Sequence, residues 1–251
     1  FIDAVGTGYS RPLGKATGKD FWGVDQDLSA FSRAIQRYVT LNQRWNSPKF
    51  LYGESYGTTR SAALVDVLQD KGMAFNGVIL MSSILNYGIR MPGYDESYIG
   101  YLPSFAAAAW YHNKVANKPA DLKTYLDQVR AWAGGPYAAA LAQGQNLPPA
   151  QLDAIAQQMA AYTGLSVQYI KEANLRVDPS RFRKELLRDQ RLTLGRYDSR
   201  FTGTDPDAAG ETPDYDASDA GISGAFVSAF HQYLEGQLNY HSQLDYRPTY
   251  G

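Results

Sequence analysis

The clearest pattern along the chain is the helical spacing of apolar residues over positions 25–45. Side chains three or four residues apart lie on one face of a helix, so this spacing predicts an amphipathic helix. The segment Asn46-Ser47-Pro48 ends it, because proline disfavours the helical conformation at the residue before it. The apolar positions are Leu28, Phe31, Ala34, Ile35, Tyr38, Val39 and Leu41.

Short apolar runs predict β-strands over residues 1–5, 49–52 and 76–81. The last run shows no alternation with polar residues, which is typical of a strand buried on both faces. Between the second and third runs we expect a helix over 58–71, which Lys71-Gly72 ends. Strands that alternate with helices in this order predict a parallel sheet with right-handed crossovers.

The sequence changes character after Leu85, and no convincing strand pattern follows. Helices are predicted over 97–117, 120–132, 149–161, 166–172, 179–188 and 223–238. We therefore expect part of an α/β core over 1–88, a helical insertion over 89–240 and a return toward the core over 241–251.

The net charge and the absence of cysteine limit which kinds of protein and which kinds of site are compatible with this sequence. The chain has 251 residues, a net charge of −1 and no cysteine. A nearly neutral charge gives no support for binding to nucleic acid or to an anionic membrane. The absence of cysteine excludes disulfides, thiolate metal sites and cysteine nucleophiles within this sequence. No run reaches the roughly 18 apolar residues of a membrane-spanning helix, so we expect none.

Two segments resemble ligand-binding loops but lack the full pattern. Gly6-Thr7-Gly8 begins like a dinucleotide-binding loop, but Arg11 stands where that fingerprint needs a third glycine. Asp205 and Asp207 begin like a calcium loop, but the residues that follow do not fit. We therefore expect no cofactor and no metal, and we interpret the acidic stretch 202–221 as a solvated loop.

Residues 53–57 form a G-x-S-x-G pentapeptide between a predicted strand and a predicted helix. This context is the one that a nucleophile elbow requires, because a sharp turn there exposes the serine hydroxyl. The flanking Gly53 and Gly57 would let strand and helix approach closely without Cβ clashes. An ordinary glycine-rich turn is the alternative, and the placement of the motif favours a catalytic Ser55.

A serine nucleophile needs a histidine base, a carboxylate that orients it and an oxyanion hole. One oxyanion donor in an elbow is the backbone N–H of the following residue, here Tyr56. The histidines at 112, 231 and 241 all lie in predicted helical segments or at helix ends, so we interpret them as surface or inter-helix polar residues. Some pairs satisfy the order serine, acid, histidine on paper: Asp214 or Asp219 followed by His231 or His241, whereas His241 and Asp245 reverse it.

Glu54 places a carboxylate next to the serine. Its side chain should point away from the nucleophile, toward the wall of the cleft. A carboxyl that shares its site with a second one can stay protonated at mildly acidic pH and donate a hydrogen bond to a substrate carboxylate. The alternatives are a solvated Glu54 or one that is paired to Arg60.

These residues resemble the serine carboxypeptidases (peptidase family S10). Gly53-Glu54-Ser55-Tyr56-Gly57 resembles the family's G-E-S-Y-G elbow. Residues 1–10 are similar to its F-x-D-x-P-x-G-x-G-F/Y-S segment, with Val5 where proline is common. Residues 195–203 are similar to the lid region of bacterial members.

The resemblance implies an α/β-hydrolase fold with a large helical lid, which releases C-terminal residues from peptides. It implies that Ser55 is the nucleophile, that the Tyr56 N–H is an oxyanion donor and that Glu54 recognises the substrate's C-terminal carboxylate. The family's N-G-G-P-G loop would precede residue 1, and its catalytic Asp and His would follow residue 251. We therefore expect a central fragment that is inactive by itself.

The resemblance also sets expectations about partners and location. The binding partner would be a peptide with a free C-terminal carboxylate. The protein would be secreted or periplasmic, and a homodimer is compatible with the resemblance. Because fold does not determine substrate, an esterase or acyltransferase on the same scaffold is an alternative, as is a catalytically inactive binding module.

Overall fold

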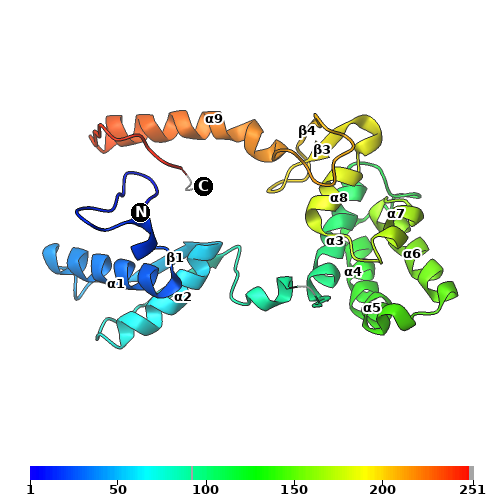
Figure 1. Cartoon of the computed structure of the whole chain (residues 1–251), viewed down its shortest axis with the longest axis horizontal. Helices are drawn as coiled ribbons and strands as arrows, with labels where there is room; N and C mark the ends of the chain where they lie inside the picture. The colour runs from blue at the N-terminus through cyan, green and yellow to red at the C-terminus, as the bar shows by residue number, and fades with distance from the viewer. Residues whose placement is uncertain (92, 249–251) are drawn as a thin grey trace. The chain divides into compact units, whose positions relative to one another are not determined.

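The chain divides into two compact units in the computed structural model, which describes residues 1–91 and 93–248 (Figure 1). The first unit comprises residues 1–87 with the segment from 239 onward, and the second comprises 88–238. The sequence-based boundaries lay at 88/89 and 240/241. The fold class is mixed α/β, with a small parallel sheet and many helices.

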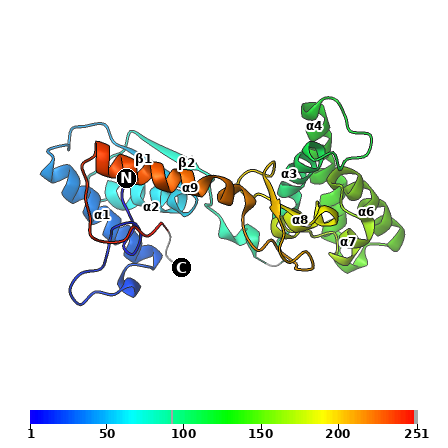
Figure 2. The ribbon, with the colours of Figure 1, turned by 90° about the horizontal axis from the view of Figure 1, so that it is seen from above.

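The first unit contains a strand–helix–strand crossover. Strands β1 (Phe50–Glu54) and β2 (Gly77–Met81) run parallel, with Cα partners from Phe50↔Gly77 to Glu54↔Met81. Helix α2 (Tyr56–Gln69) connects them and packs along both strands, and α1 (Val24–Leu41) packs against α2 (Figure 2). These elements confirm the predicted helices and the second and third predicted strands. Short 3-10 helices complete this part of the chain: η1 (Gly18–Asp20) and η2 (Tyr87–Arg90), the latter at the boundary between the units.

Helix α1 ends four residues before the predicted end at Trp45. Asn42 leaves the helical conformation, and Gln43 follows with a φ of 54°. The N–H of Arg44 then turns back to the carbonyl of Val39 at 2.8 Å, which satisfies a carbonyl at the helix end.

The predicted strand over residues 1–5 does not form. The N–H of Thr7 donates to Ala4 O at 2.9 Å, and the Asp3 carboxylate accepts from the N–H of Tyr9 at 3.2 Å, so local turns replace a ladder. Gly8 has a φ of 52°, and a Cβ there would lie 1.8 Å from the Asp3 carboxylate. In the described residues β1 therefore pairs with β2 alone.

The prediction that β2 is buried on both faces is also wrong. Val78 and Leu80 are each 38% exposed, whereas Ile79 and Met81 are more than half exposed. Leu51 and the buried Gly53 are paired with Val78 and Leu80, so this is the face that α2 partly covers. The unit's core is small and consists of Leu28, Phe31, Val39, Leu64, Leu68 and Met73.

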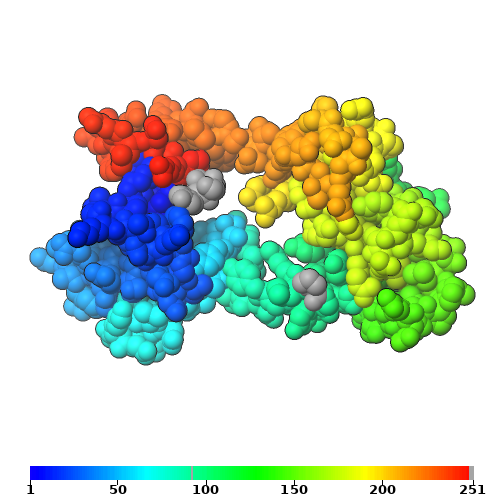
Figure 3. Space-filling view, viewed as in Figure 1, coloured from blue at the N-terminus to red at the C-terminus, as the bar shows by residue number. Residues whose placement is uncertain are grey.

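The second unit is mainly helical, and its side chains form a continuous surface over α5–α7 (Figure 3). Its α-helices are α3 (Glu96–Tyr111), α4 (Leu122–Trp132), α5 (Ala138–Gln143), α6 (Pro149–Thr163), α7 (Val167–Glu172), α8 (Pro179–Glu185) and α9 (Ala217–Gln232). Single π-turns follow α4 (η3, Ala133–Tyr137) and α9 (η6, Tyr233–Gln237), and 3-10 turns lie at η4 (Gly144–Asn146) and η5 (Arg188–Gln190).

All six predicted helices of this region are present, with shifted ends. Helix α3 ends at Tyr111 rather than 117, because Asn113 adopts a left-handed φ of 57°. Helix α9 begins at Ala217 rather than 223, because the Asp216 side chain accepts from the N–H of Ser218 and caps it. The prediction had missed the short α5.

The prediction of no strand after Leu85 is wrong in one place. Strands β3 (Leu192–Leu194) and β4 (Thr202–Thr204) form an antiparallel hairpin, paired from Leu192↔Thr204 to Leu194↔Thr202. Three residues per strand are too few to show a periodic pattern, and burial of Thr193 and Leu194 against the helices stabilises the hairpin instead.

The second unit has an extensive core that draws on nearly all of its helices. The alanine-rich stretch of α3 lies at its centre, because Ala106 and Ala109 are fully buried where α3 meets α4 and α6. Phe105 stacks on Phe182 of α8 with ring centroids 4.2 Å apart. Among the described residues, none of the helices combines the length and apolar character that crossing a membrane would take.

Candidate active site

Ser55 is the single residue between β1 and α2, and its backbone has a φ of 61° and a ψ of −116°. A positive φ is unfavourable for a residue with a Cβ and costs about 1–3 kcal/mol, so the surrounding structure must hold it in place. Its N–H donates to Met81 O at 3.0 Å, which extends the pairing of β1 with β2 to the serine. Strain of this kind gathers at functional sites in proteins.

Gly53 is what allows the turn to be this sharp. A Cβ at Gly53 would lie 1.9 Å from the backbone carbonyl oxygen of Gly57 and 2.6 Å from Ser61 Oγ, so no other residue fits. A Cβ at Gly57 would meet nothing within 4 Å. The expectation that both glycines are needed for the close approach is therefore right for Gly53 and wrong for Gly57.

A buried threonine ties the turn to the loop after β2. Thr58, which is fully buried, donates from Oγ1 to Ser55 O at 2.6 Å, and its N–H donates to the same oxygen at 3.0 Å. Thr58 Oγ1 also accepts from the Ile84 N–H at 3.0 Å, while Thr59 Oγ1 donates to Ile84 O at 2.6 Å. The sequence analysis missed both threonines, although two hydroxyl residues in the first turn of a helix are a usual sign of terminal hydrogen bonding.

The start of α2 offers free backbone donors beside the serine. Within the part of the chain that the structure describes, the N–H groups of Tyr56 and Gly57 donate to no acceptor. The first N–H groups of a helix lack intrahelical partners and carry partial positive charge, so they bind anions. The position predicted for an oxyanion donor, Tyr56 N–H, is thus available to a negative charge that develops next to Ser55.

Glu54 ends β1 and is exposed, on the opposite side of the strand from the buried Gly53. Its carboxylate has no hydrogen bond or ion pair with any described residue. Arg60, considered above as its partner, instead binds Asp27 through Nε at 2.7 Å and through a terminal nitrogen at 3.0 Å. The carboxylate of Glu54 is therefore open to a ligand.

The Asp27–Arg60 pair holds the first turn of α2 against α1. The Arg60 guanidinium lies 4.1 Å from the centroid of the Phe31 ring and 5.2 Å from that of Tyr56. Burial raises the pKa of the Tyr56 phenol, and the nearby Asp27 carboxylate raises it further. Sequence spacing could not reveal this group, because Asp27 and Arg60 are 33 positions apart.

A small hollow lies beside Tyr56. It has a volume of about 190 Å³, and Phe21, Trp22 and Phe31 are among the side chains that line it. A mostly apolar wall with one ion pair suits a single apolar or aromatic side chain.

Among the described residues of the first unit, no acid and no histidine form a hydrogen-bonded triad with Ser55. In the described part of the first unit, Ser55 Oγ has no hydrogen-bond partner, and His241 shares a hydrogen bond with the Asn239 side chain at 3.1 Å. Asp245 contributes its backbone carbonyl to Arg11 at 2.7 Å. The other candidates lie in the second unit: His112 against Ser199 O at 2.7 Å, Asp214 against the Asp207 N–H at 3.2 Å, and Asp219 and His231 on α9.

Comparisons of the chain with protein-family models, with curated proteins and with solved structures gave no match.

Proposed function

We propose that Ser55 is the nucleophile of an α/β-hydrolase that acts as a serine carboxypeptidase. The observation that carries the proposal is the strained Ser55, with φ at 61°, held between β1 and α2 next to free N–H donors. A plain glycine-rich turn would place glycine at the strained position. Here Ser55 has the strained backbone conformation, and glycine occupies position 53, where a Cβ would collide with helix α2.

The proposed reaction combines this geometry with a general base, which no described residue supplies through a hydrogen bond to Ser55 Oγ. A general base takes the proton of Ser55 Oγ, and the oxygen attacks the carbonyl carbon of the scissile bond. The tetrahedral oxyanion forms at the start of α2, where the Tyr56 N–H stabilises it. The amine then leaves with a proton, and water releases the acyl group from Ser55.

Glu54 makes an exopeptidase the favoured hydrolase. Its unpaired carboxyl adjoins the nucleophile, so a substrate carboxylate bound there would place the last peptide bond near Ser55. A protonated carboxyl donates a hydrogen bond to a carboxylate, so such a pair would hold the peptide by its C-terminus. The hollow of about 190 Å³ beside Tyr56 would then accept one side chain of the peptide.

Covalent labelling tests the nucleophile. In the complete protein, a fluorophosphonate probe should label Ser55, and mass spectrometry should find the adduct on its peptide. A Ser55→Ala variant should lose the label, whereas Ser61→Ala, which alters another hydroxyl of α2, should keep it. Equal labelling of the wild type and Ser55→Ala would overturn the proposal.

Substrate discrimination tests Glu54. The wild type should release residues from a peptide with a free C-terminus and not from its amidated form. Glu54→Ala should reduce this discrimination at least about tenfold, roughly the effect of losing one charge-assisted hydrogen bond. Glu96→Ala alters an exposed glutamate in the second unit and serves as the matched control. Unchanged discrimination in Glu54→Ala would remove the carboxylate-recognition role.

A further inference from the structure

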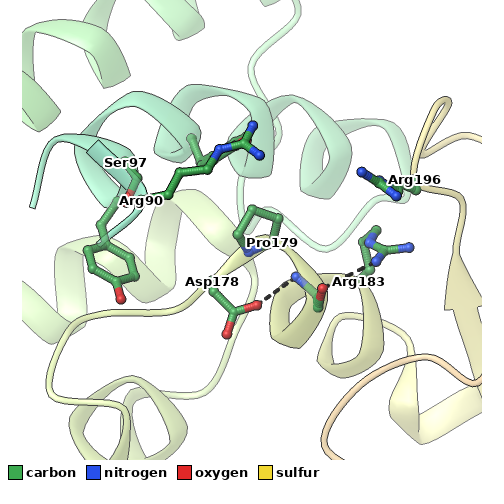
Figure 4. A pocket seen from close by; sticks show the side chains of 9 residues that line it. Arg90, Ser97, Asp178, Pro179, Arg183 and Arg196 are labelled. Carbon is green, nitrogen blue, oxygen red and sulfur yellow. Dashed lines mark hydrogen bonds between the residues drawn. The ribbon is translucent and has the colours of Figure 1, made fainter. Parts of the chain in front are cut away.

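The second unit contains a hollow of about 600 Å³ toward which three arginines converge: Arg90, Arg183 and Arg196 (Figure 4). They come from separate segments: the end of η2, the middle of α8 and the loop that follows β3. The guanidinium groups of Arg183 and Arg196 lie near each other, and Arg90 extends toward the same space from another element.

These arginines lack the carboxylate partners that most others in the unit have. Arg130, Arg176, Arg181, Arg188 and Arg200 all form ion pairs. Within the described ranges 1–91 and 93–248, no ion pair involves the three arginines of the hollow. Among the described residues, the buried Nε of Arg183 has no hydrogen-bond partner, and the side chain makes only one hydrogen bond, a long one of 3.4 Å to Ser180 Oγ.

The three guanidinium groups of the hollow face two nearby carboxylates, those of Asp178 and Asp216, so one positive charge is in excess. Burial lowers the pKa of the Arg183 guanidinium; Asp216 opposes that effect, and the like charge of Arg196 adds to it. Of the two nearby carboxylates, Asp178 lines the hollow, accepts from the N–H of Ser180 at 2.8 Å and lies 3.7 Å from Arg181 Nε. Asp216 accepts from the N–H of Arg196 at 2.8 Å through Oδ1, and its Oδ2 is buried without a hydrogen-bond partner among the described residues. Apposed guanidinium groups repel each other unless an anion lies between them.

The rest of the wall suits a polar ligand. Ser97 and Ser180 add hydroxyl groups, and Tyr98 and Tyr101 of α3 add ring faces with phenol groups. Arginine presents a planar fork of donors that matches the paired oxygens of phosphate and carboxylate groups. A ligand with two negative charges would satisfy the unpartnered Arg183 and would relieve its repulsion with Arg196.

We propose that this hollow is a binding site for a small dianionic oxyanion, either a phosphate monoester or a dicarboxylate. The site lies wholly within the second unit and does not depend on the chemistry at Ser55. Arg183 and Arg196 bind the anionic group, and Arg90 supplies the charge on the opposite wall.

Calorimetric titration of the full-length protein tests the site, with inorganic phosphate, succinate and acetate at pH 8 and constant ionic strength. Phosphate or succinate should bind at least about tenfold more tightly than the monoanion acetate, which is a difference of about 1.4 kcal/mol. Tighter binding of phosphate than succinate identifies a phosphate ester as the ligand class, and the reverse identifies a dicarboxylate.

Variants connect the binding to the arginines. Arg196→Gln and Arg183→Gln should each weaken phosphate binding at least about tenfold. Arg130→Gln, which removes an exposed arginine paired with Asp127, should bind like the wild type. Arg196 is exposed, so its variant tests the site even where loss of Arg183 disturbs folding. Affinity that is equal in the wild type and Arg196→Gln, or acetate binding as tight as that of both dianions, would overturn the proposal.

Discussion

The two units hold their functional residues in different ways. The helices of the second unit pack around a core of 21 buried residues. The first unit has a smaller cluster of six buried residues, which lies between α1, α2 and the segment after α2. Strand β2 of the first unit leaves Ile79 and Met81 more than half exposed, although its sequence is that of an internal strand. The unit that carries the candidate nucleophile thus buries less apolar surface around it.

Around Ser55, where few apolar side chains are buried, hydrogen bonds hold the turn in place. The strained Ser55 is held by its own N–H bond to Met81, by Thr58 and by the loop that Thr59 fastens at Ile84. Each such bond contributes only about 0.5–1.5 kcal/mol, so the turn depends on several acting together. In the second unit the corresponding polar feature, Lys184 with Asp205, is enclosed completely. Because each unit has its own core and its own polar contacts, a substitution that destabilises one unit should leave the other folded.

The largest effect should come from breaking the enclosed ion pair. Lys184 is 0% and Asp205 is 1% exposed, with Nζ and Oδ2 2.6 Å apart. Asp205→Ala would leave an unpaired buried ammonium, which costs about 3–5 kcal/mol of unfolding free energy. Trp22 and Trp45 of the first unit are replaced by Phe, so that tryptophan fluorescence reports on Trp110 and Trp132 of the second unit. Urea unfolding in this background should show the loss, while Ser55 labelling should persist.

Asp127→Ala is the control for this prediction. It removes a carboxylate from an exposed ion pair on α4, so the unfolding free energy should hardly change. A similar response of both variants would show that the buried pair has no special weight in the second unit.

A smaller effect, confined to the first unit, should follow from Gly53→Ala. The added Cβ would collide with the Gly57 carbonyl at 1.9 Å, and relief of that contact costs about 1–3 kcal/mol and displaces Ser55. Fluorophosphonate labelling should fall sharply. The unfolding transition of the second unit, followed by tryptophan fluorescence in the same Trp22→Phe, Trp45→Phe background, should not shift.

Gly57→Ala provides the contrast on the same turn. Its Cβ meets nothing within 4 Å, and alanine favours the helical conformation by about 0.5–1 kcal/mol over glycine. Thermal unfolding should therefore show a slight gain. Equal losses in both variants would contradict the close approach assigned to Gly53.

The smallest effect concerns a surface pair of the second unit. Hydrogen bonds from Arg200 lower the pKa of Asp198 from 3.8 to about 2. Because the folded-state pKa lies below the unfolded one, the stabilisation is present above about pH 4 and is lost as the pH falls through about 2. A carboxyl titration by NMR should give a midpoint near 2, and Arg200→Ala should shift it toward 3.8. A midpoint that does not move would show that Arg200 is not the cause.

Much of the local structure could be predicted from the sequence. The spacing of Leu28, Phe31 and Ile35 predicted α1, and the apolar runs around residues 53–57 predicted the strand–helix–strand crossover that places Ser55 at its turn. These features depend on residues that are close in the chain, where periodicity and turn residues carry the information.

Errors arose where distant residues compete with local pattern. Residues 1–5 are apolar enough for a strand, but Asp3 bonds to Tyr9 and the segment folds into turns. The uniform apolar run of β2 predicted that the strand is buried on both faces. The burial of a strand depends on how many elements cover it, and no local pattern specifies that number.

The sequence by itself determined the turn at Ser55, helices α1 and α2 and the strand–helix–strand order around that turn, because each follows from the spacing of neighbouring side chains. Only the tertiary structure decided that Asp27 would neutralise Arg60 and leave Glu54 open, and that Arg90, Arg183 and Arg196 would share one hollow. Charge pairing acts through space over a few ångströms, so residues far apart in the chain become partners only after the fold has formed.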